Sequence, residues 1–318
     1  MSSKKDVIVL AYAGGLETSV ALAWLADQYQ ADVVTLTLDL GQATDLSDVR
    51  DQALAIGAVR AHVIDVRDEL ARTAVTPALK HGCDQPRVAA LSRPLIGRQL
   101  ARVADIEGTA TVAHGSLQPV LSDSGMDAAI LDANEDLHVL APCRDWDLSL
   151  RAKVEFAQAR GIPVPPSGAA LTSVRSLWGR ALSGDLLSGP WTELPPEAFL
   201  LTCTVADWPK TPATLVVEFD EGVPTSLNGV AMPLVELLAS LETVAGAHGV
   251  GRLDFPAIDR VRPRIVEEAP GPVVLHQAMK ALATAAPETW PAVHGRVTLT
   301  CSMGECRIDE CRVEEVPV

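Results

Sequence analysis

The sequence predicts an α/β protein of two domains, a doubly wound parallel sheet followed by an α+β domain. Strand-like and helix-like segments alternate through the first half of the chain, which is the pattern of a parallel sheet with helices on both faces. Near residue 165 the composition changes, because three prolines and a glycine lie within residues 163–168. A length of 318 residues is typical of two domains of about 150 residues each. We therefore expect the domains to span residues 1–165 and 166–318.

The first domain begins with a strand at residues 7–11, whose unbroken apolar run VIVLA is typical of a strand buried on both faces. A helix is predicted at residues 18–28, where Val20, Leu22 and Leu25 lie near helical spacing. The same criteria predict further strands at 33–38, 62–66, 110–113 and 139–141, and further helices at 46–56, 68–79, 91–106 and 149–160. The last helix is expected to end at Gly161, ahead of the prolines at the boundary.

The second domain is expected to hold a small antiparallel sheet. Residues 215–219 are predicted to form a strand, and residues 222–224 and the Asn228-Gly229 pair are typical of turns between such strands. A helix is expected at residues 233–245. Residues 297–300 and 307–309 are expected to pair as a hairpin near the C-terminus.

The composition argues against several classes of protein. Lysine and arginine total 26 against 41 aspartates and glutamates, and the resulting net charge of −15 disfavours a nucleic-acid-binding surface. No stretch reaches the ~18 apolar residues of a membrane span, and the N-terminus lacks a signal-peptide pattern. Six scattered cysteines do not suggest a disulfide framework. We expect a cytoplasmic protein that acts on small molecules, with no nucleic-acid or membrane partner.

A glycine-rich loop directly after the first strand is the strongest candidate for chemistry. Gly14 and Gly15 allow the backbone to approach a ligand, and Thr18 and Ser19 lie where the next helix exposes its free N–H groups. Such a loop can bind an anion even in a strongly acidic chain. The loop matches neither a Walker A sequence nor a dinucleotide fingerprint. On Gly14 and Gly15 alone, an ordinary tight turn and a phosphate-binding loop are equal alternatives.

Segments along the rest of the chain extend this motif. The loop resembles the pyrophosphate loop of the N-type ATP pyrophosphatases, and it belongs to a series of segments that occur in the same order in argininosuccinate synthase. The segments are AYAGGLETSVALAWL at 11–25, LDLGQ at 38–42, SRPLI at 92–96, AHG at 113–115, APCR at 141–144, GIPVP at 161–165, LWGR at 177–180, EFDEGVP at 218–224 and AGAHGVGR at 245–252. The chain is therefore identified as a divergent member of the argininosuccinate synthase family. The resemblance implies a nucleotide-binding PP-loop domain of the HUP class followed by a synthetase domain.

The resemblance also implies a reaction. In the family, the ureido oxygen of citrulline attacks the α-phosphorus of MgATP, and the amine of aspartate then displaces AMP. We expect an ATP-dependent C–N ligase that forms AMP and pyrophosphate, with Mg²⁺ carried by ATP and not fixed by the protein. Its partners are expected to be an amino-acid-like, amide or ureido compound and an amine donor.

The resemblance assigns roles to individual residues. Those at the ATP-binding positions are Ala11, Tyr12, Ala13, Gly14, Gly15, Leu16, Glu17, Thr18, Ser19, Leu38, Arg93, His114 and Gly115. Catalytic roles are expected for Glu17, Ser19 and Arg93. Two loop residues depart from the family, because Ala13 replaces a serine and Glu17 replaces an aspartate. Since one lost hydroxyl removes about 0.5–1.5 kcal/mol of net hydrogen bonding, ATP binding is expected to survive.

The residues at the family's substrate positions depart further. Gln85 stands where the family has a tyrosine, and Ala89 and Ala90 stand where it has threonine and serine. The other predicted pocket residues are Leu121 at an asparagine, Asp127 near an aspartate, Thr172 and Ala181 at two serines, and Glu267 near a tyrosine. A site that loses its hydrogen-bonding groups also loses most of its selectivity for the original substrate. We therefore expect a pair of substrates other than citrulline and aspartate, with a less polar acceptor, in specialised metabolism.

Several alternatives stay open at this stage. The chain could be a genuine argininosuccinate synthase with a rebuilt pocket, or a catalytically degenerate homologue that only binds a nucleotide. Cys83 precedes the altered segment and would support a variant that transfers sulfur. The family's long C-terminal segment has no counterpart after Val318. The resemblance therefore predicts a shortened member, and a homo-oligomer such as a dimer in place of the family's tetramer.

Overall fold

A computed structural model describes residues 5–81, 88–116, 125–146, 149–164, 172–184, 187, 193–257 and 264–314. The contacts divide the chain into two compact units, Met1–Val66 with Ser92–Ala170 and Arg67–Leu91 with Leu171–Val318. The boundary expected near residue 165 places 67–91 in the first domain, whereas the contacts place this segment in the second unit. The reason is packing, because Val75, Leu79 and Val88 are buried in the second unit's hydrophobic core.

The first unit is built on a five-stranded sheet in the order β3-β2-β1-β4-β5, with every pair parallel. Its strands are β1 Val7–Ala11, β2 Asp32–Asp39, β3 Arg60–Asp65, β4 Thr111–Ala113 and β5 His138–Leu140. Val9 and Leu10 of the central strand have no exposed surface. The prediction of a parallel sheet in an α/β fold is therefore confirmed.

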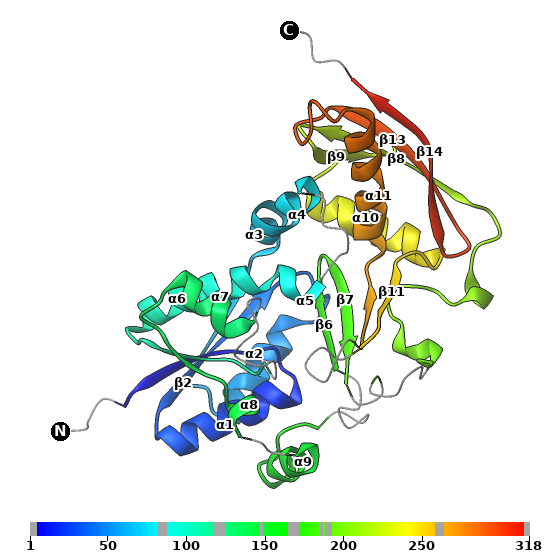
Figure 1. Ribbon diagram of the computed structural model, residues 1–318. Coiled ribbons are helices and arrows are strands. Elements are labelled where there is room, and N and C mark those ends of the chain that lie inside the picture. The colour runs from blue at the N-terminus through cyan, green and yellow to red at the C-terminus, as the bar shows by residue number, and fades with distance from the viewer. Residues whose placement is uncertain are drawn as a thin grey trace. The chain divides into compact units, whose positions relative to one another are not determined.

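Helices lie on both faces of this sheet, as the doubly wound prediction requires (Figure 1). They are α1 Leu16–Tyr29, α2 Leu46–Ile56, α6 Arg93–Glu107, α7 Met126–Ala133, α8 Pro142–Asp145 and α9 Leu150–Ala159. Helix α6 packs on α7, and α1 packs on α9 on the other side of the sheet. Asp45 caps α2 by accepting a 2.9 Å hydrogen bond from the Ser47 N–H, which explains why this helix begins where the sequence predicts.

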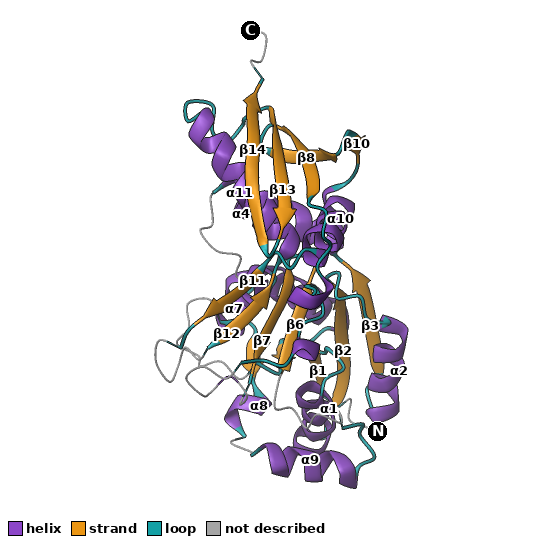
Figure 2. Ribbon diagram, turned by 90° about the vertical axis from the view of Figure 1, so that its right-hand side faces the viewer, coloured by secondary structure: helices purple, strands orange, loops and turns teal. Residues whose placement is uncertain are grey.

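The second unit contains two antiparallel sheets, which Figure 2 shows as strands in orange. One has the order β10-β9-β8-β13-β14, and the other β11-β12-β7-β6. The strands are β6 Thr172–Ser176, β7 Gly179–Ser183, β8 Ala213–Asp220, β9 Val223–Leu227, β10 Val230–Ala231, β11 Arg252–Phe255, β12 Ile265–Glu268, β13 Gly295–Ser302 and β14 Glu305–Val313. The β13–β14 pair confirms the predicted C-terminal hairpin.

The helices of the second unit are α5 Val88–Leu91, α10 Leu234–Ala247, α11 Pro270–Ala285 and the segment α3 Arg67–Leu70, π-helix Ala71–Val75, α4 Thr76–Lys80. The sequence predicts one regular helix over 68–79, but Pro77 has no N–H to donate. The Thr76 hydroxyl instead donates to the Ala71 carbonyl at 3.0 Å, where the helix widens into the π-turn. In the part of the chain that the structure describes, no helix combines the length and apolar character needed to cross a membrane.

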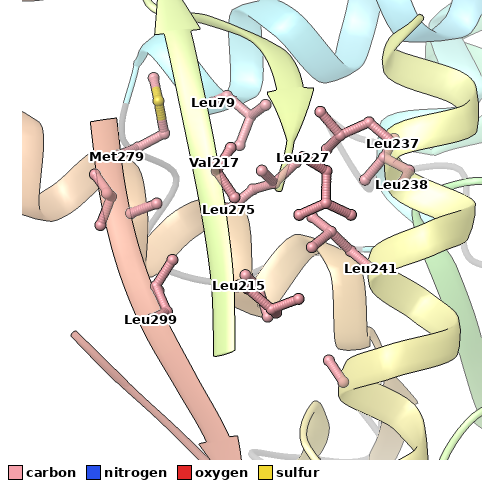
Figure 3. Close-up of a cluster of buried hydrophobic side chains, with 14 of the residues drawn as sticks. Leu79, Leu215, Val217, Leu227, Leu237, Leu238, Leu241, Leu275, Met279 and Leu299 are labelled. Carbon is pink, nitrogen blue, oxygen red and sulfur yellow. The ribbon is translucent and has the colours of Figure 1, made fainter. Parts of the chain in front are cut away.

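The core of the second unit lies between the β8–β13 sheet and helices α10 and α11. Leu215 and Val217 of β8 and Leu299 of β13 face Leu241 and its neighbours on α10 (Figure 3). Their side chains are almost completely buried. Most of this core is leucine, valine and alanine, with Trp178 and Phe219 as its buried aromatic residues, in keeping with a chain that has only 4% aromatic residues.

Candidate active site

The predicted ATP-binding residues gather at one end of the parallel sheet in the first unit. From β1 the strand order runs outward through β2 to β3 on one side and through β4 to β5 on the other. In such sheets, ligands bind outside the carboxyl ends of the strands at the point where the order reverses. The loop after β1 holds Gly14 and Gly15, and the loop after β4 holds His114 and Gly115. The predicted loop therefore lies at the end of the sheet where this fold class binds its ligands.

The loop after β1 leaves the N-terminus of α1 open. Gly14 has a φ of +76°, a conformation that favours glycine, and Gly15 at the N-cap has a φ of −75° with no side-chain cap. Among the described residues, no atom lies within 4 Å of a Cβ atom built on Gly15. The first intrahelical bond runs from the Ser19 N–H to the Gly15 carbonyl at 3.0 Å. The earlier N–H groups of the helix are therefore available to an anion.

Hydroxyl groups hold the loop in this shape. Thr18 Oγ1 accepts from the Ala13 N–H at 3.4 Å and donates to the Gly15 carbonyl at 3.3 Å. The Ser19 hydroxyl is buried and lies 2.9 Å from the Tyr12 hydroxyl. Burial raises the pKa of Tyr12, so the phenol stays protonated near neutral pH. Ser19 thus fixes the loop from inside, and its catalytic role stays a prediction.

Among the apolar members of the predicted set, the two leucines are buried and Ala13 is exposed. Leu16 packs with Val20 against α9, where only 5% of its surface is exposed. Leu38 in β2 is also buried, and its carbonyl accepts from the Gln42 side chain at 2.8 Å. Ala11 ends β1, and Ala13 is exposed. Ala13, which stands where the family has a serine, therefore exposes its side chain at the loop.

Glu17 in the first turn of α1 has a partner that the sequence analysis did not identify. Its carboxylate Oε2 lies 2.8 Å from the Lys153 ammonium of α9, and Lys153 is only 5% exposed. The Glu17 carbonyl accepts from the Cys143 thiol at 3.3 Å. Lys153 lies three residues after Leu150 and four before Ala157, which both pack in the α1–α9 cluster. That spacing is the sequence signal that could have revealed a buried lysine.

His114, Asp127 and Arg144 form a polar cluster in the same unit. His114 Nδ1 accepts from the Ser116 N–H at 3.1 Å, so Nε2 carries the proton and faces Asp127 Oδ2 at 3.5 Å. Burial lowers the pKa of His114, which keeps the ring neutral. Burial is the largest single influence on the pKa of Asp127 and opposes its ionisation. The 2.7 Å hydrogen bond from Arg144, together with the surrounding charges and backbone, nevertheless holds this pKa below its usual range. The arrangement suits His114 for positioning and not for proton transfer.

Gly115 and Arg93 complete the predicted set in the first unit. A Cβ atom on Gly115 would lie 2.7 Å from Thr18 Cγ2, so the loop after β4 touches the start of α1 only because this residue is glycine. Arg93 is the first residue of α6 and is half-buried. Burial lowers the pKa of Arg93, although the guanidinium remains charged at physiological pH.

Several predicted substrate residues come together in the second unit. Glu267 of β12 is 2% exposed, and its Oε1 accepts from the Val88 N–H of α5 at 3.3 Å. Ala181 of β7 lies directly opposite Glu267 in the sheet. Ala89 and Ala90 belong to α5, which contacts β6 and β7. Thr172 begins β6 and pairs with Ser183. Asp127 lies in the other unit, and Gln85, Leu121 and Cys83 lie outside the described residues.

A second buried carboxylate, Glu268, holds the connection around Thr202. It has no exposed surface and accepts from the N–H groups of Leu201 and Thr202 at 2.9 and 3.0 Å. Its Oε2 lies 3.0 Å from Arg180 NH1. Both carboxylate oxygens are thus engaged by several donors from the connection and from Arg180, which indicates a structural role for Glu268.

Comparisons with known proteins identify related sequences over most of the chain. Residues 7–163 match the family model described as the arginosuccinate synthase N-terminal HUP domain, and residues 173–288 match the arginosuccinate synthase C-terminal domain. Proteins named argininosuccinate synthase are similar in sequence. The relative from Oceanobacillus iheyensis is 39% identical over 87% of this chain and 69% of its own length. The relative from Symbiobacterium thermophilum is 41% identical over 89% of this chain and 72% of its own length.

A further relative, from Streptococcus gordonii, is 38% identical over 87% of this chain and 71% of its own length. Among solved structures, a predicted tRNA methyltransferase subunit from Methanocaldococcus jannaschii covers 48% of this chain at 15% identity with a TM-score of 0.35, which is too low to support an argument. The two family models together match most of the chain, and the identities to the named synthases lie near 40%. The chain belongs to the argininosuccinate synthase family of ATP-dependent C–N ligases.

Proposed function

We propose that the chain cleaves ATP between its α- and β-phosphates and uses the adenylate to form a C–N bond. The observation that carries this proposal is the open loop at Gly14 and Gly15, which offers the free N–H groups of α1 at the switch point of the sheet. Those groups are suited to the pyrophosphate end of the nucleotide, because they point partial positive charge at the ligand.

The proposed reaction has two steps. An oxygen of the acceptor attacks the α-phosphorus, and the bond to pyrophosphate breaks with its electron pair on the leaving oxygen. The nitrogen of the amine donor then attacks the activated carbon, AMP leaves with the acceptor's oxygen, and the amine loses a proton. The N–H groups ahead of Ser19 would stabilise the charge that grows on pyrophosphate. Magnesium would enter bound to ATP and share that charge.

The acceptor and the amine are first proposed to be citrulline and aspartate. The names of the relatives support this pair, and with it a place in arginine biosynthesis, because each is called argininosuccinate synthase. The test is incubation with ATP, Mg²⁺, citrulline and aspartate, followed by detection of AMP and argininosuccinate by mass spectrometry. Product that needs all three substrates would establish the activity.

A different pair of substrates is the second candidate, and the surroundings of Glu267 favour it. Ala181 stands opposite this buried carboxylate, and α5, which holds Ala90, contacts the strand of Ala181 and donates the Val88 N–H to Glu267. Small apolar residues therefore stand at positions where the family has hydroxyl groups. A less polar amide or carboxyl acceptor would fit them better than citrulline. This candidate gains support if citrulline and aspartate give no AMP while another amide and amine do. The relatives' names give no support to a role in specialised metabolism.

Two further outcomes complete the test. A chain that binds ATP but forms no AMP with any amide, ureido or carboxyl compound would be a degenerate nucleotide-binding homologue. Any turnover to AMP excludes that alternative.

We also propose that the chain forms a homo-oligomer, with a dimer as the simplest form. Light scattering at several protein concentrations tests this, and a monomer at every concentration would contradict it.

A further inference from the structure

A buried ion pair lies at the base of the glycine loop. Lys153 of α9 is 5% exposed, and its ammonium is 2.8 Å from Glu17 Oε2 on α1. Lysine is rarely buried unless it is paired. The two helices pack through Leu16, Val20 and Ala157, so their apolar contact brings the lysine to the first turn of α1.

Glu17 creates an electrostatic problem for an anion site. It lies in the first turn of the helix whose free N–H groups are proposed to receive pyrophosphate, and a carboxylate there repels a second anion. Its backbone is fixed, because its carbonyl accepts from Cys143 and its neighbour Thr18 lies against Gly115. The charge therefore has to be neutralised by a side chain that reaches it, and Lys153 does so.

We propose that Lys153 is a positioning residue of the nucleotide site, which neutralises Glu17 and draws its carboxylate toward α9 so that the loop can accept the phosphates of ATP. The inference rests on the proposed function, since it names how the same loop binds its polyanion. Lys153 acts through Glu17, and no contact between its ammonium and the nucleotide is required. With Lys153 beside it, Glu17 belongs to an ion pair with no net charge, and the pair does not repel the phosphates of ATP.

The proposal predicts a reciprocal pattern among three variants. Lys153→Met leaves Glu17 uncompensated and is expected to weaken ATP binding about 10- to 100-fold, the range for one unscreened charge near a partly buried site. Glu17→Gln alone is expected to bind ATP at least as tightly as the parent chain. The double variant Lys153→Met with Glu17→Gln is expected to return to within about threefold of the parent, because the repelling charge is gone.

Arg151 provides a matched control on the same helix. It forms an exposed pair with Glu155 at 2.8 Å, and its side chain is 89% exposed. Arg151→Met removes the same charge from α9 and is expected to leave the affinity unchanged. Affinities are measured by isothermal titration calorimetry with ATP alone on the full chain, and thermal unfolding checks that each variant is folded.

The proposal is overturned if Lys153→Met binds ATP like the parent, or if the double variant binds as weakly as Lys153→Met. If Lys153→Met does not fold, Glu17→Gln decides the matter, because weaker ATP binding by this variant contradicts the proposal. A parent chain that binds ATP but never forms AMP refutes the ligase function and leaves the comparison of affinities valid. A parent chain that binds no ATP refutes both.

Discussion

Substitution of Gly15 by alanine separates ligand binding from folding in the loop. Gly15 has a φ of −75° and a ψ of 167°, which alanine adopts without strain, and a Cβ atom there meets no atom within 4 Å in the part of the chain that the structure describes. The stability of Gly15→Ala should therefore stay within about 0.5 kcal/mol of the parent or rise slightly, because alanine restricts the unfolded chain. The added methyl group, however, enters the space that we assign to the phosphates of ATP.

The neighbouring residue Gly14 provides the matched control. Its φ of +76° lies in the left-handed region, and a Cβ atom would lie 3.2 Å from both methyl groups of Val49. Gly14→Ala should cost about 1–2 kcal/mol for the backbone conformation alone. The two substitutions add the same methyl group one residue apart, and only Gly14→Ala is expected to lower the melting temperature clearly.

Calorimetric titration with ATP gives the decisive comparison. If the methyl group of Gly15→Ala displaces even one hydrogen bond to a charged phosphate, about 1.5–3 kcal/mol is lost, which weakens binding by about 10- to 150-fold. Circular dichroism on the same samples reports the melting temperatures. Wild-type ATP affinity in a folded Gly15→Ala variant would refute the assignment of the loop as the phosphate site.

Three further predictions concern buried groups in either unit. Burial lowers the pKa of His114, so its stabilising contribution is complete above about pH 6.5 and is lost as the pH falls below that value. The melting temperature of His114→Gln should therefore fall less between pH 7.5 and 5.5 than that of the parent, and an equal fall would contradict this. Glu268→Gln leaves Arg180 without its counter-charge and should lower the free energy of unfolding of the second unit by about 3–5 kcal/mol in urea titrations, whereas a loss below 1 kcal/mol would show the cluster to be dispensable. Burial raises the pKa of Cys143 to about 12, so iodoacetamide at pH 8 should label exposed Cys203 and spare Cys143 in mass spectra; equal labelling would contradict the buried thiol.

The parallel sheet and its loop could be predicted from the sequence because their signals are local. The run at residues 7–11 is apolar throughout, and the Gly14-Gly15 pair lies directly between that strand and a helix. Both features need only neighbouring residues to be recognised. The hairpin of β13 and β14 was predicted for the same reason, since its two strands are separated by a two-residue turn at Met303 and Gly304.

The elements that the sequence analysis missed depend on distant partners. The β11-β12-β7-β6 sheet is made of strands of only four or five residues. The burial of Glu267 and Glu268 depends on Val88, Arg180 and Thr202, which are distant in the sequence. The same holds for segment 67–91, which was expected in the first domain. It packs in the core of the second unit, and most residues of that core follow residue 171 in the sequence.

Within the candidate site, the family resemblance named the loop residues but not their partners. Lys153 lies 136 residues after Glu17, and no local pattern links them. The spacing of Lys153 to Leu150 and Ala157 could have indicated a buried helix face, but not the partner. Asp127 was assigned to the substrate pocket, and the structure shows it paired with Arg144 and close to His114. Long-range ion pairs of this kind follow from the fold and not from sequence spacing.

The position at which ATP is cleaved tests the central claim most directly. Phosphorus NMR distinguishes cleavage between the α- and β-phosphates of ATP from cleavage between the β- and γ-phosphates. The reaction contains MgATP, citrulline and aspartate, and it is repeated with a panel of amides and amines. A loop that holds the pyrophosphate end while the α-phosphorus is attacked should give AMP and pyrophosphate in equal amounts over many turnovers, and sustained turnover should require both an acceptor and an amine. Formation of ADP and inorganic phosphate, or unchanged ATP with every pair, would contradict the account.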